Sequence, residues 1–234
     1  MTNPLLDVKD LHAWYGESHV LHGVDMHVAP GETVCILGRN GMGKTTTLRS
    51  IMGILRQRQG QILLNGRDIM NIPLHHTARA GLGFVPEERG IFASLSVHEN
   101  LMLPPKVADG GMSVDEIYDL FPNLLERRNS PGTKLSGGEQ QMLAMARILR
   151  TGANCLLLDE PTEGLAPVII QRIGEVLSRL KERGMTVVLV EQNFRFASKI
   201  ADRFYLMNHG RMAAEFPVSD LPRQAEMLQA ALGV

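Results

Sequence analysis

The sequence predicts an α/β protein whose mostly parallel sheet is interrupted by a helical segment. Short apolar runs of strand length alternate with helical patterns in the first and last parts of the chain. Between about residues 88 and 150 the strand signals fade and helical stretches dominate. The 234 residues, 44% of them hydrophobic and 21% charged, are enough for one substantial core, or for one core with a small appended subdomain.

Strands are predicted wherever a short apolar run lies between turn signals. These runs cover residues 5–11, 24–28, 33–37, 61–65, 82–85, 154–158, 186–191 and 203–207. The apolar run Leu156, Leu157 and Leu158 is typical of a central strand that has helices on both faces. Strands that alternate with helices imply a mostly parallel sheet.

Helices are predicted from apolar residues at helical spacing and from the glycines that follow them. The predicted helices cover residues 45–52, 97–103, 114–127, 138–150, 168–183 and 222–232. Gly53 and Gly184 stand directly after two of these segments, where glycine commonly ends a helix. The helix over 222–232 is expected on the surface.

The composition argues against several classes of function. A net charge of −1 gives no basic bias toward nucleic acid, so no nucleic-acid partner is expected. No apolar run reaches the roughly 18 residues of a bilayer span, and no signal peptide is evident, so work at a membrane would require docking on other chains. Cys35 and Cys155 lie in buried apolar runs, which fits a reducing compartment. His75 and His76 are expected in a solvated loop, since no third metal ligand stands nearby.

A glycine-rich motif between a strand and a helix predicts a phosphate-binding loop. Residues 38–45 match G-x-x-x-x-G-K-[ST] in full. Glycines let several backbone N–H groups point inward, and the following helix adds its positive end. The predicted nucleotide contacts are Gly38, Asn40, Gly41, Gly43, Lys44, Thr45 and Thr46. Lys44 would reach the β- and γ-phosphates and Thr45 would offer its hydroxyl to Mg²⁺. The alternative is a glycine-rich turn that merely joins strand to helix.

Two acidic residues follow the apolar run at residues 155–158. Asp159, at the end of the predicted strand, would hold Mg²⁺ directly or through water. Glu160 would polarise the attacking water as a general base. An Asp-Glu pair after a strand is by itself often a solvated turn, and it is the phosphate loop upstream that favours the catalytic interpretation.

A third motif, at residues 135–139, precedes another predicted helix. Ser136 is a plausible helix cap, and Gly137 and Gly138 expose N–H groups at the positive helix end, which makes a second anion site. A single chain has no evident need for two phosphate sites on one nucleotide. A dimer in which each chain completes the site of its partner would resolve this, whereas an ordinary helix start is the alternative.

These three motifs, in this order and roughly at these spacings, resemble the ATPase subunit of ABC transporters over nearly the whole chain. The resemblance implies a P-loop NTPase core with a small antiparallel N-terminal β part at about residues 1–87 and 151–234, and a helical subdomain at about 88–150. It also implies head-to-tail dimers, with ATP between the phosphate loop of one subunit and Ser136, Gly137, Gly138 and Glu139 of the other. Tyr15 would stack on adenine, unless it is only a half-buried aromatic at a strand end.

A closer resemblance is carried by residues 84–89, 163–167 and 190–197. These segments are similar to the smaller, F-type ATP-binding subunit of branched-chain amino-acid transporters, and importers of urea and short-chain amides share much of the pattern. The resemblance implies an ATPase on the cytoplasmic face of the inner membrane that works with two multi-span permease subunits and, indirectly, with a periplasmic solute-binding protein. It also implies a homologous ATPase subunit as partner in a heterodimer, whereas a homodimer is possible in isolation. The helical segment would grip short cytoplasmic helices of the permeases.

Three positions depart from the general ABC pattern. Glu87 stands where most members have Gln, so a carboxylate would face the γ-phosphate region through Mg²⁺ or water. Gln192 stands where most have His; it still donates a hydrogen bond to the γ-phosphate but carries no charge. Ala166 replaces a frequent Asp, which puts a contact between subunits in doubt. All three are expected of the F-type pattern.

Two other functions remain open from the sequence. A soluble ABC ATPase acting on DNA or ribosomes typically has a long coiled-coil insert or two cassettes in one chain, and this chain shows neither. A regulatory ATP-sensing module with little turnover is favoured by Gln192 but disfavoured by the presence of Glu160.

Overall fold

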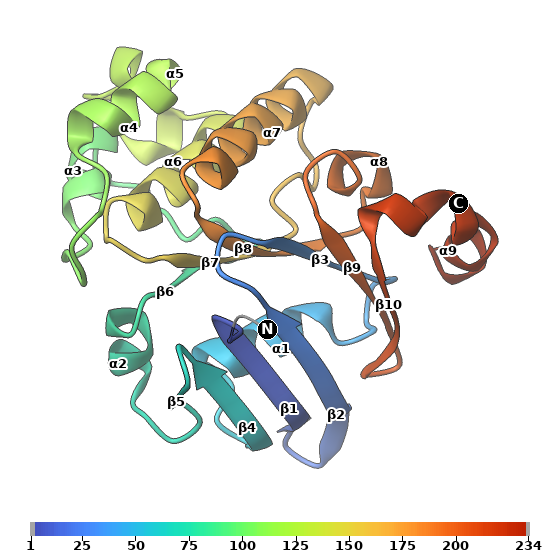
Figure 1. Cartoon of the computed structure of the whole chain (residues 1–234). Coiled ribbons are helices and arrows are strands. Elements are labelled where there is room, and N and C mark those ends of the chain that lie inside the picture. Colours follow the sequence, from blue (N-terminus) through green and yellow to red (C-terminus); the bar gives the residue numbers. More distant parts are fainter. Residues whose placement is uncertain (1–2, 233–234) are drawn as a thin grey trace.

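The computed structural model describes residues 3–232, which form two sheets with helices between and beside them (Figure 1). The first sheet has the strand order β2-β1-β4-β5 and its neighbouring strands pair antiparallel. Its strands are β1 (Leu6–Tyr15), β2 (Ser18–Val28), β4 (Arg58–Leu64) and β5 (Arg67–Asp68). The small antiparallel β part is therefore present as predicted.

The second sheet carries the ends of the strands that will form the site. Its order is β10-β9-β3-β8-β7-β6, and all neighbours are parallel except the hairpin of β9 and β10. Its strands are β3 (Thr33–Leu37), β6 (Leu82–Val85), β7 (Cys155–Asp159), β8 (Thr186–Glu191), β9 (Arg203–Asn208) and β10 (Arg211–Pro217). The mostly parallel sheet is confirmed.

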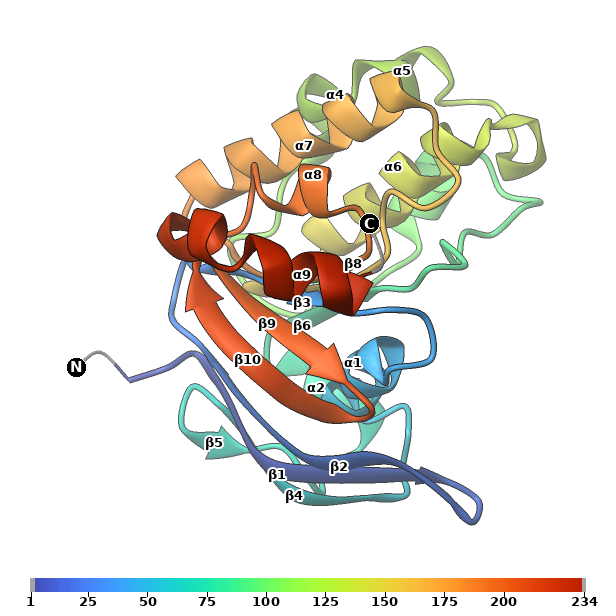
Figure 2. The same cartoon turned by 90° about the vertical axis from the view of Figure 1, so that its right-hand side faces the viewer.

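Both faces of this parallel sheet are covered, because every residue of β3, β7 and β8 is buried. Val34 and Ile36 of β3 pack in one apolar cluster with α1 (Lys44–Met52) and the antiparallel sheet. Cys35 and Leu37 point the other way, into a cluster with α6 (Gly137–Leu149) and α7 (Pro167–Glu182). Figures 1 and 2 show these two layers on opposite sides of the parallel sheet. Because successive side chains of a strand point to opposite faces of the sheet, β3 contributes to both apolar clusters.

The helical segment consists of short helices that pack beside α6. They are α3 (Val97–Met102), α4 (Val114–Leu120) and α5 (Pro122–Glu126). Ser96, Ser113 and Ser136 each form a complete capping box at the start of a helix, which fixes where α3, α4 and α6 begin. The boundaries of a separate subdomain at residues 88 and 150 stay a prediction.

The single helix predicted over residues 114–127 is wrong. The chain leaves the helical conformation at Phe121, which has φ −128° and ψ 72°, and α5 starts at Pro122. Proline disfavours a helical conformation in the residue before it and is well tolerated as the first residue of a helix. One predicted helix is therefore two.

Several elements escaped prediction. Besides β5 and β10 they include α2 (Leu74–Arg79), α8 (Phe194–Ala197) and two 3₁₀ segments (Gly132–Lys134 and Val218–Arg223). His75 and His76 are exposed as expected, but they lie on α2 and not in a loop. The C-terminal helix, α9 (Ala225–Leu232), begins after Pro222 and not at it. Within residues 3–232 no helix has the length and apolar character needed to cross a membrane.

Candidate active site

The glycine-rich loop runs from the end of β3 at Leu37 to the start of α1 at Lys44. Its glycines are required by the backbone. A Cβ atom on Gly38 would lie 2.7 Å from the carbonyl oxygen of Met207, and Gly43 has a φ of 107°, which side chains rarely adopt. Gly43 caps α1 without any side-chain hydrogen bond, so the first amides of the helix remain directed at the loop. The loop thus has the form expected of an anion cradle.

The loop opens onto a cavity of about 360 Å³. The predicted residues that line it are Asn40, Gly41, Gly43, Lys44, Thr45, Thr46, Glu87 and Glu160. Lys44 is almost fully buried, and its ammonium group lies 3.1 Å from a carboxylate oxygen of Glu160 and donates to the carbonyl oxygen of Arg39 at 3.1 Å. The glycine-rich loop, the end of β7 and the Glu160 carboxylate therefore meet at one edge of the parallel sheet.

Glu160 follows β7 directly and is held by side chains from three segments. Gln192, which follows the neighbouring strand β8, donates to the second carboxylate oxygen of Glu160 at 2.6 Å. Burial raises the pKa of Glu160, but hydrogen bonds from Glu163 and Gln192 and the charge of Lys44 outweigh it, so its pKa lies below the ordinary value. An ionised carboxylate is what a general base requires.

Thr45 and Asp159 form the oxygen pair predicted for Mg²⁺. The Thr45 hydroxyl donates to Asp159 Oδ1 at 2.9 Å, while Asp159 Oδ2 is buried without a hydrogen-bond partner. Burial, together with the charges of Glu160 and Glu87, raises the pKa of Asp159 to about 6. A hydroxyl and a carboxylate suit Mg²⁺, which usually takes few protein ligands and completes its shell with phosphate oxygens and water. The residues present therefore fit the ion.

The third residue predicted at the metal site is Glu87. Within residues 3–232 no three His, Cys, Asp or Glu side chains are grouped as a metal site. Glu87 lines the same cavity as Thr45 and is exposed.

Two acidic residues of this region were missed by the sequence analysis. Glu163 lines the phosphate cavity, and a hydrogen bond to Glu160, reinforced by burial, raises its pKa to about 7. Glu191, at the end of β8, is buried; it accepts from the Thr162 hydroxyl at 2.7 Å and from the Asn193 amide at 3.1 Å. Glu191 therefore ties the segment after Glu160 to the segment that carries Gln192.

The second predicted anion site lies elsewhere in the chain. Ser136 caps α6, and both its amide and its hydroxyl donate to the Glu139 carboxylate at 2.8 Å. Gly138 is buried against Ile169 of α7, and Gly137 lies beside the Arg89 guanidinium. Ser136 and Glu139 line a separate hollow of about 580 Å³ that shares no lining residue with the phosphate cavity. One chain therefore does not bring the two anion sites together.

Tyr15 and Ala166 stand at the margins of the site. Tyr15 ends β1 with 44% of its surface exposed and does not line the phosphate cavity. Burial lowers the pKa of Arg49, but the neighbouring Tyr15 side chain and the Glu88 carboxylate raise it overall, so Tyr15 is placed beside α1. Ala166 is the N-cap of α7 and gives that helix no side-chain cap.

The parallel sheet, the glycine-rich loop and the acidic residues after β7 define a P-loop nucleotide hydrolase. The sequence profile of the family described as ABC transporter matches residues 21–163, and the chain belongs to that family. It is an ATP-binding domain with ATPase activity, which confirms the predicted family, fold and enzyme class.

Relatives with curated names include transport proteins of two kinds. The chain is 40% identical to the high-affinity branched-chain amino acid transport ATP-binding protein BraG of Pseudomonas aeruginosa, over 89% of this chain and 91% of that protein. It is 36% identical to the probable branched-chain amino acid transport ATP-binding protein LivF of Archaeoglobus fulgidus, over 98% and 99%. It is 33% identical to the lipopolysaccharide export system ATP-binding protein LptB of Escherichia coli, over 97% of each.

Solved structures agree with this assignment. The structure of an ATP-binding subunit of an ABC transporter is 30% identical, with a TM-score of 0.80 over 98% of this chain and 96% of that one. A dimeric ATP-binding cassette in a post-hydrolysis state with ADP and Pi is 26% identical, with a TM-score of 0.78 over 91% of this chain and 98% of that one.

Proposed function

We propose that this chain is the peripheral ATPase subunit that powers import of branched-chain amino acids across the cytoplasmic membrane. The observation that carries the proposal is the identity of 40% and 36% to two proteins named for that transport, over nearly the whole of each chain. We assign the selection and passage of the solute to other chains, and the cavity beside the phosphate loop, lined mostly by polar groups, to the phosphates of the nucleotide.

At the phosphate loop, the chain's own residues bind and orient the nucleotide. The amides from Gly41 to Thr46 and the Lys44 ammonium hold the triphosphate, which displaces Lys44 from Glu160. Mg²⁺, held from Thr45 and Asp159, would neutralise charge on the β- and γ-oxygens. Tyr15 contributes an exposed ring to the adenine.

Hydrolysis then depends on the groups at the ends of β7 and β8. Glu160, freed from Lys44, accepts a proton from the attacking water. Gln192 keeps the Glu160 carboxylate oriented through its 2.6 Å hydrogen bond and offers its amide to the γ-phosphate. Because Gln192 stays neutral over the physiological range, positioning is its contribution.

The separation of the two anion sites supports a two-chain assembly. Ser136 and Gly137 are accessible at the end of α6, away from the phosphate cavity of the same chain. We propose that they cover the nucleotide of a homologous partner subunit in a head-to-tail dimer, as a heterodimer in the working transporter. The dimeric cassette with ADP and Pi is a precedent among proteins of this fold.

Docking to the two permease subunits is assigned to the helical segment. Phe92, Met102 and Leu103 are each exposed by 46% or more, so this segment offers large apolar side chains that a partner could cover. Short cytoplasmic helices of the permeases would cover them. A periplasmic binding protein would deliver the solute on the other side of the membrane.

Reconstitution tests the transported solute. The chain is assembled in proteoliposomes with the proposed permeases, second ATPase and binding protein, and uptake of labelled leucine is measured with and without Mg·ATP. We expect ATP-dependent uptake that disappears with Glu160→Gln in this chain. Uptake of urea or a short-chain amide, without uptake of leucine, would show that this chain powers one of the related importers. ATP-driven release of lipopolysaccharide from the membrane would show that it has the export role of the LptB relatives.

A further inference from the structure

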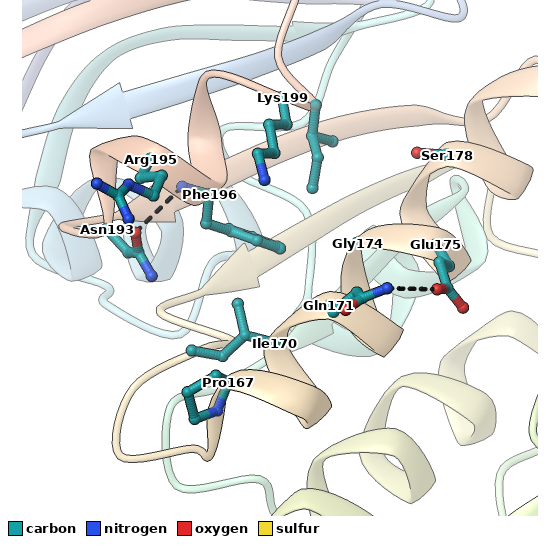
Figure 3. A pocket seen from close by; sticks show the side chains of 11 residues that line it. Pro167, Ile170, Gln171, Gly174, Glu175, Ser178, Asn193, Arg195, Phe196 and Lys199 are labelled. Atoms are coloured by element: carbon teal, nitrogen blue, oxygen red, sulfur yellow. Dashed lines mark hydrogen bonds between the residues drawn. The ribbon is translucent and has the colours of Figure 1, made fainter.

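A groove of about 870 Å³ separates α7 from α8 and the segment after it, and the catalytic residues do not use it. Figure 3 shows the groove, with Phe196 and Lys199 extending from one wall toward α7. The opposite wall is a single stripe of α7 that runs from Pro167 to Ser178. At a rise of 1.5 Å per residue this stripe is about 16 Å long, or about three helical turns. The groove thus has the length of a docked helix.

The floor of the groove is apolar and is kept open by a glycine. Phe196 and Ile200 form it from one side and Ile170 from the other. A Cβ atom on Gly174 would lie 3.5 Å from Phe196 and 3.8 Å from Ile200, which are ordinary van der Waals contacts. Alanine therefore fits at this position, whereas a larger side chain would fill the groove.

The charges on the two walls are unequal. Arg195 and Lys199 are exposed on the α8 side, and within the described chain neither forms an ion pair with a carboxylate. Glu175, on the α7 side, is already paired with Arg172 at 2.9 Å and accepts a hydrogen bond from Gln171 at 3.3 Å. The groove therefore offers two cations and an apolar floor, which is complementary to an apolar helix face flanked by carboxylates.

The groove also reaches the segments that hold the catalytic residues. Asn193, in one wall, directly follows Gln192, and its side chain caps α8 by accepting from the Phe196 amide at 3.1 Å. Pro167, in the other wall, follows the loop that begins at Glu163. Buried Glu191 joins these two segments by hydrogen bonds to Thr162 and Asn193. An occupant that presses on both walls would therefore shift Gln192 relative to Glu160.

We propose that this groove binds an amphipathic, acidic helix of a partner protein, and that its docking regulates ATP turnover. The helix lays apolar side chains over Pro167 and Ile170, which are accessible in the groove, and directs carboxylates toward Arg195 and Lys199. This regulation rests on the ATPase activity of the chain and is independent of which solute is transported.

The probe is a synthetic three-turn peptide with leucines along one face and glutamates beside them; a companion peptide carries lysines in place of the glutamates. Binding to the full chain is followed by fluorescence anisotropy, and the ATPase rate is measured with and without peptide. We expect the acidic peptide to bind more tightly than the basic one and to change kcat. In the double variant Arg195→Glu with Lys199→Glu, the acidic peptide should bind at least about tenfold more weakly and the basic peptide should gain affinity.

A matched pair of variants tests the apolar floor. Gly174→Ala should bind the acidic peptide as the wild type does, whereas Gly174→Met should weaken binding about tenfold, and thermal unfolding of both confirms that they fold. Equal affinity for the two peptides, equal binding by both Gly174 variants, or binding that leaves kcat unchanged would overturn the proposal. Light scattering that shows self-association of the free chain, lost in Gly174→Met, would assign the groove to a second copy instead. None of these readouts involves transport, so their failure is distinct from failure of the import function.

Discussion

Replacing Glu160 by Gln should make this chain bind the nucleotide more tightly while it stops turnover. In the structure, Lys44 and Glu160 form an ion pair at 3.1 Å, with only 3% and 7% of their side chains exposed. The triphosphate needs the Lys44 ammonium, so the wild-type protein must separate this pair when ATP binds. A charge-assisted hydrogen bond contributes about 2 kcal/mol net, which corresponds to about 30-fold in Kd. Glu160→Gln removes that competition because the amide carries no charge.

The assay is calorimetric titration of dilute protein with Mg²⁺ and a non-hydrolysable ATP analogue, so that turnover does not enter the measured affinity. Glu163→Gln is the matched control, because Glu163 lines the same cavity but is not paired with Lys44. We expect the Glu160 variant to bind roughly 30-fold more tightly than wild type and the Glu163 variant to change much less. Equal affinity of wild type and Glu160→Gln, or equal tightening by both variants, would refute the reasoning.

Three further predictions concern turnover, packing and acid stability. Glu160→Gln should lower steady-state ATP turnover by about 10²–10⁴, as measured by phosphate release, whereas a near-normal rate would remove Glu160 as the base. Gly138→Ala should lower the free energy of unfolding by about 1–3 kcal/mol, because the added Cβ would lie 2.7 Å from Ile169. In a double-mutant cycle measured by denaturant unfolding, the same substitution made in an Ile169→Ala background should cost much less. Burial raises the pKa of Glu32, but the hydrogen bonds from Arg203 and Ala29 outweigh burial and lower its pKa overall. The stability that Glu32 contributes is therefore present above the usual carboxyl pKa and is lost as the pH falls through the lowered pKa. Glu32→Gln should flatten the acid side of the curve of unfolding free energy against pH, and an unchanged curve would contradict this.

The strands of the core were predictable from sequence because almost all of their residues are buried. The runs predicted at residues 33–37, 82–85 and 186–191 match β3, β6 and β8 residue for residue. β10 was missed because its residues are mostly exposed, so no continuous apolar run marks it. The break at Pro122 could have been recognised from the proline itself.

Some residues of the candidate site could be predicted from sequence and others could not. The phosphate loop is contiguous in sequence, so its members could be named from the residue pattern alone, and folding brings Lys44, Thr45, Asp159 and Glu160 together as the strand ends suggested. Glu191 could not be found in this way, because its hydrogen bonds to Thr162 depend on β7 and β8 being neighbours in the sheet. The roles assigned to the individual site residues stay predictions.

The central claim is that a triphosphate binds at the amides before Lys44, and equilibrium binding of Mg·ATP to wild type and to Lys44→Ala tests it most directly. We expect measurable binding by the wild type and a loss of at least about 100-fold in the variant, which corresponds to about 3 kcal/mol for a charged phosphate contact. Thermal unfolding shows whether the variant remains folded. Equal affinity of a folded Lys44→Ala protein and the wild type would contradict the account.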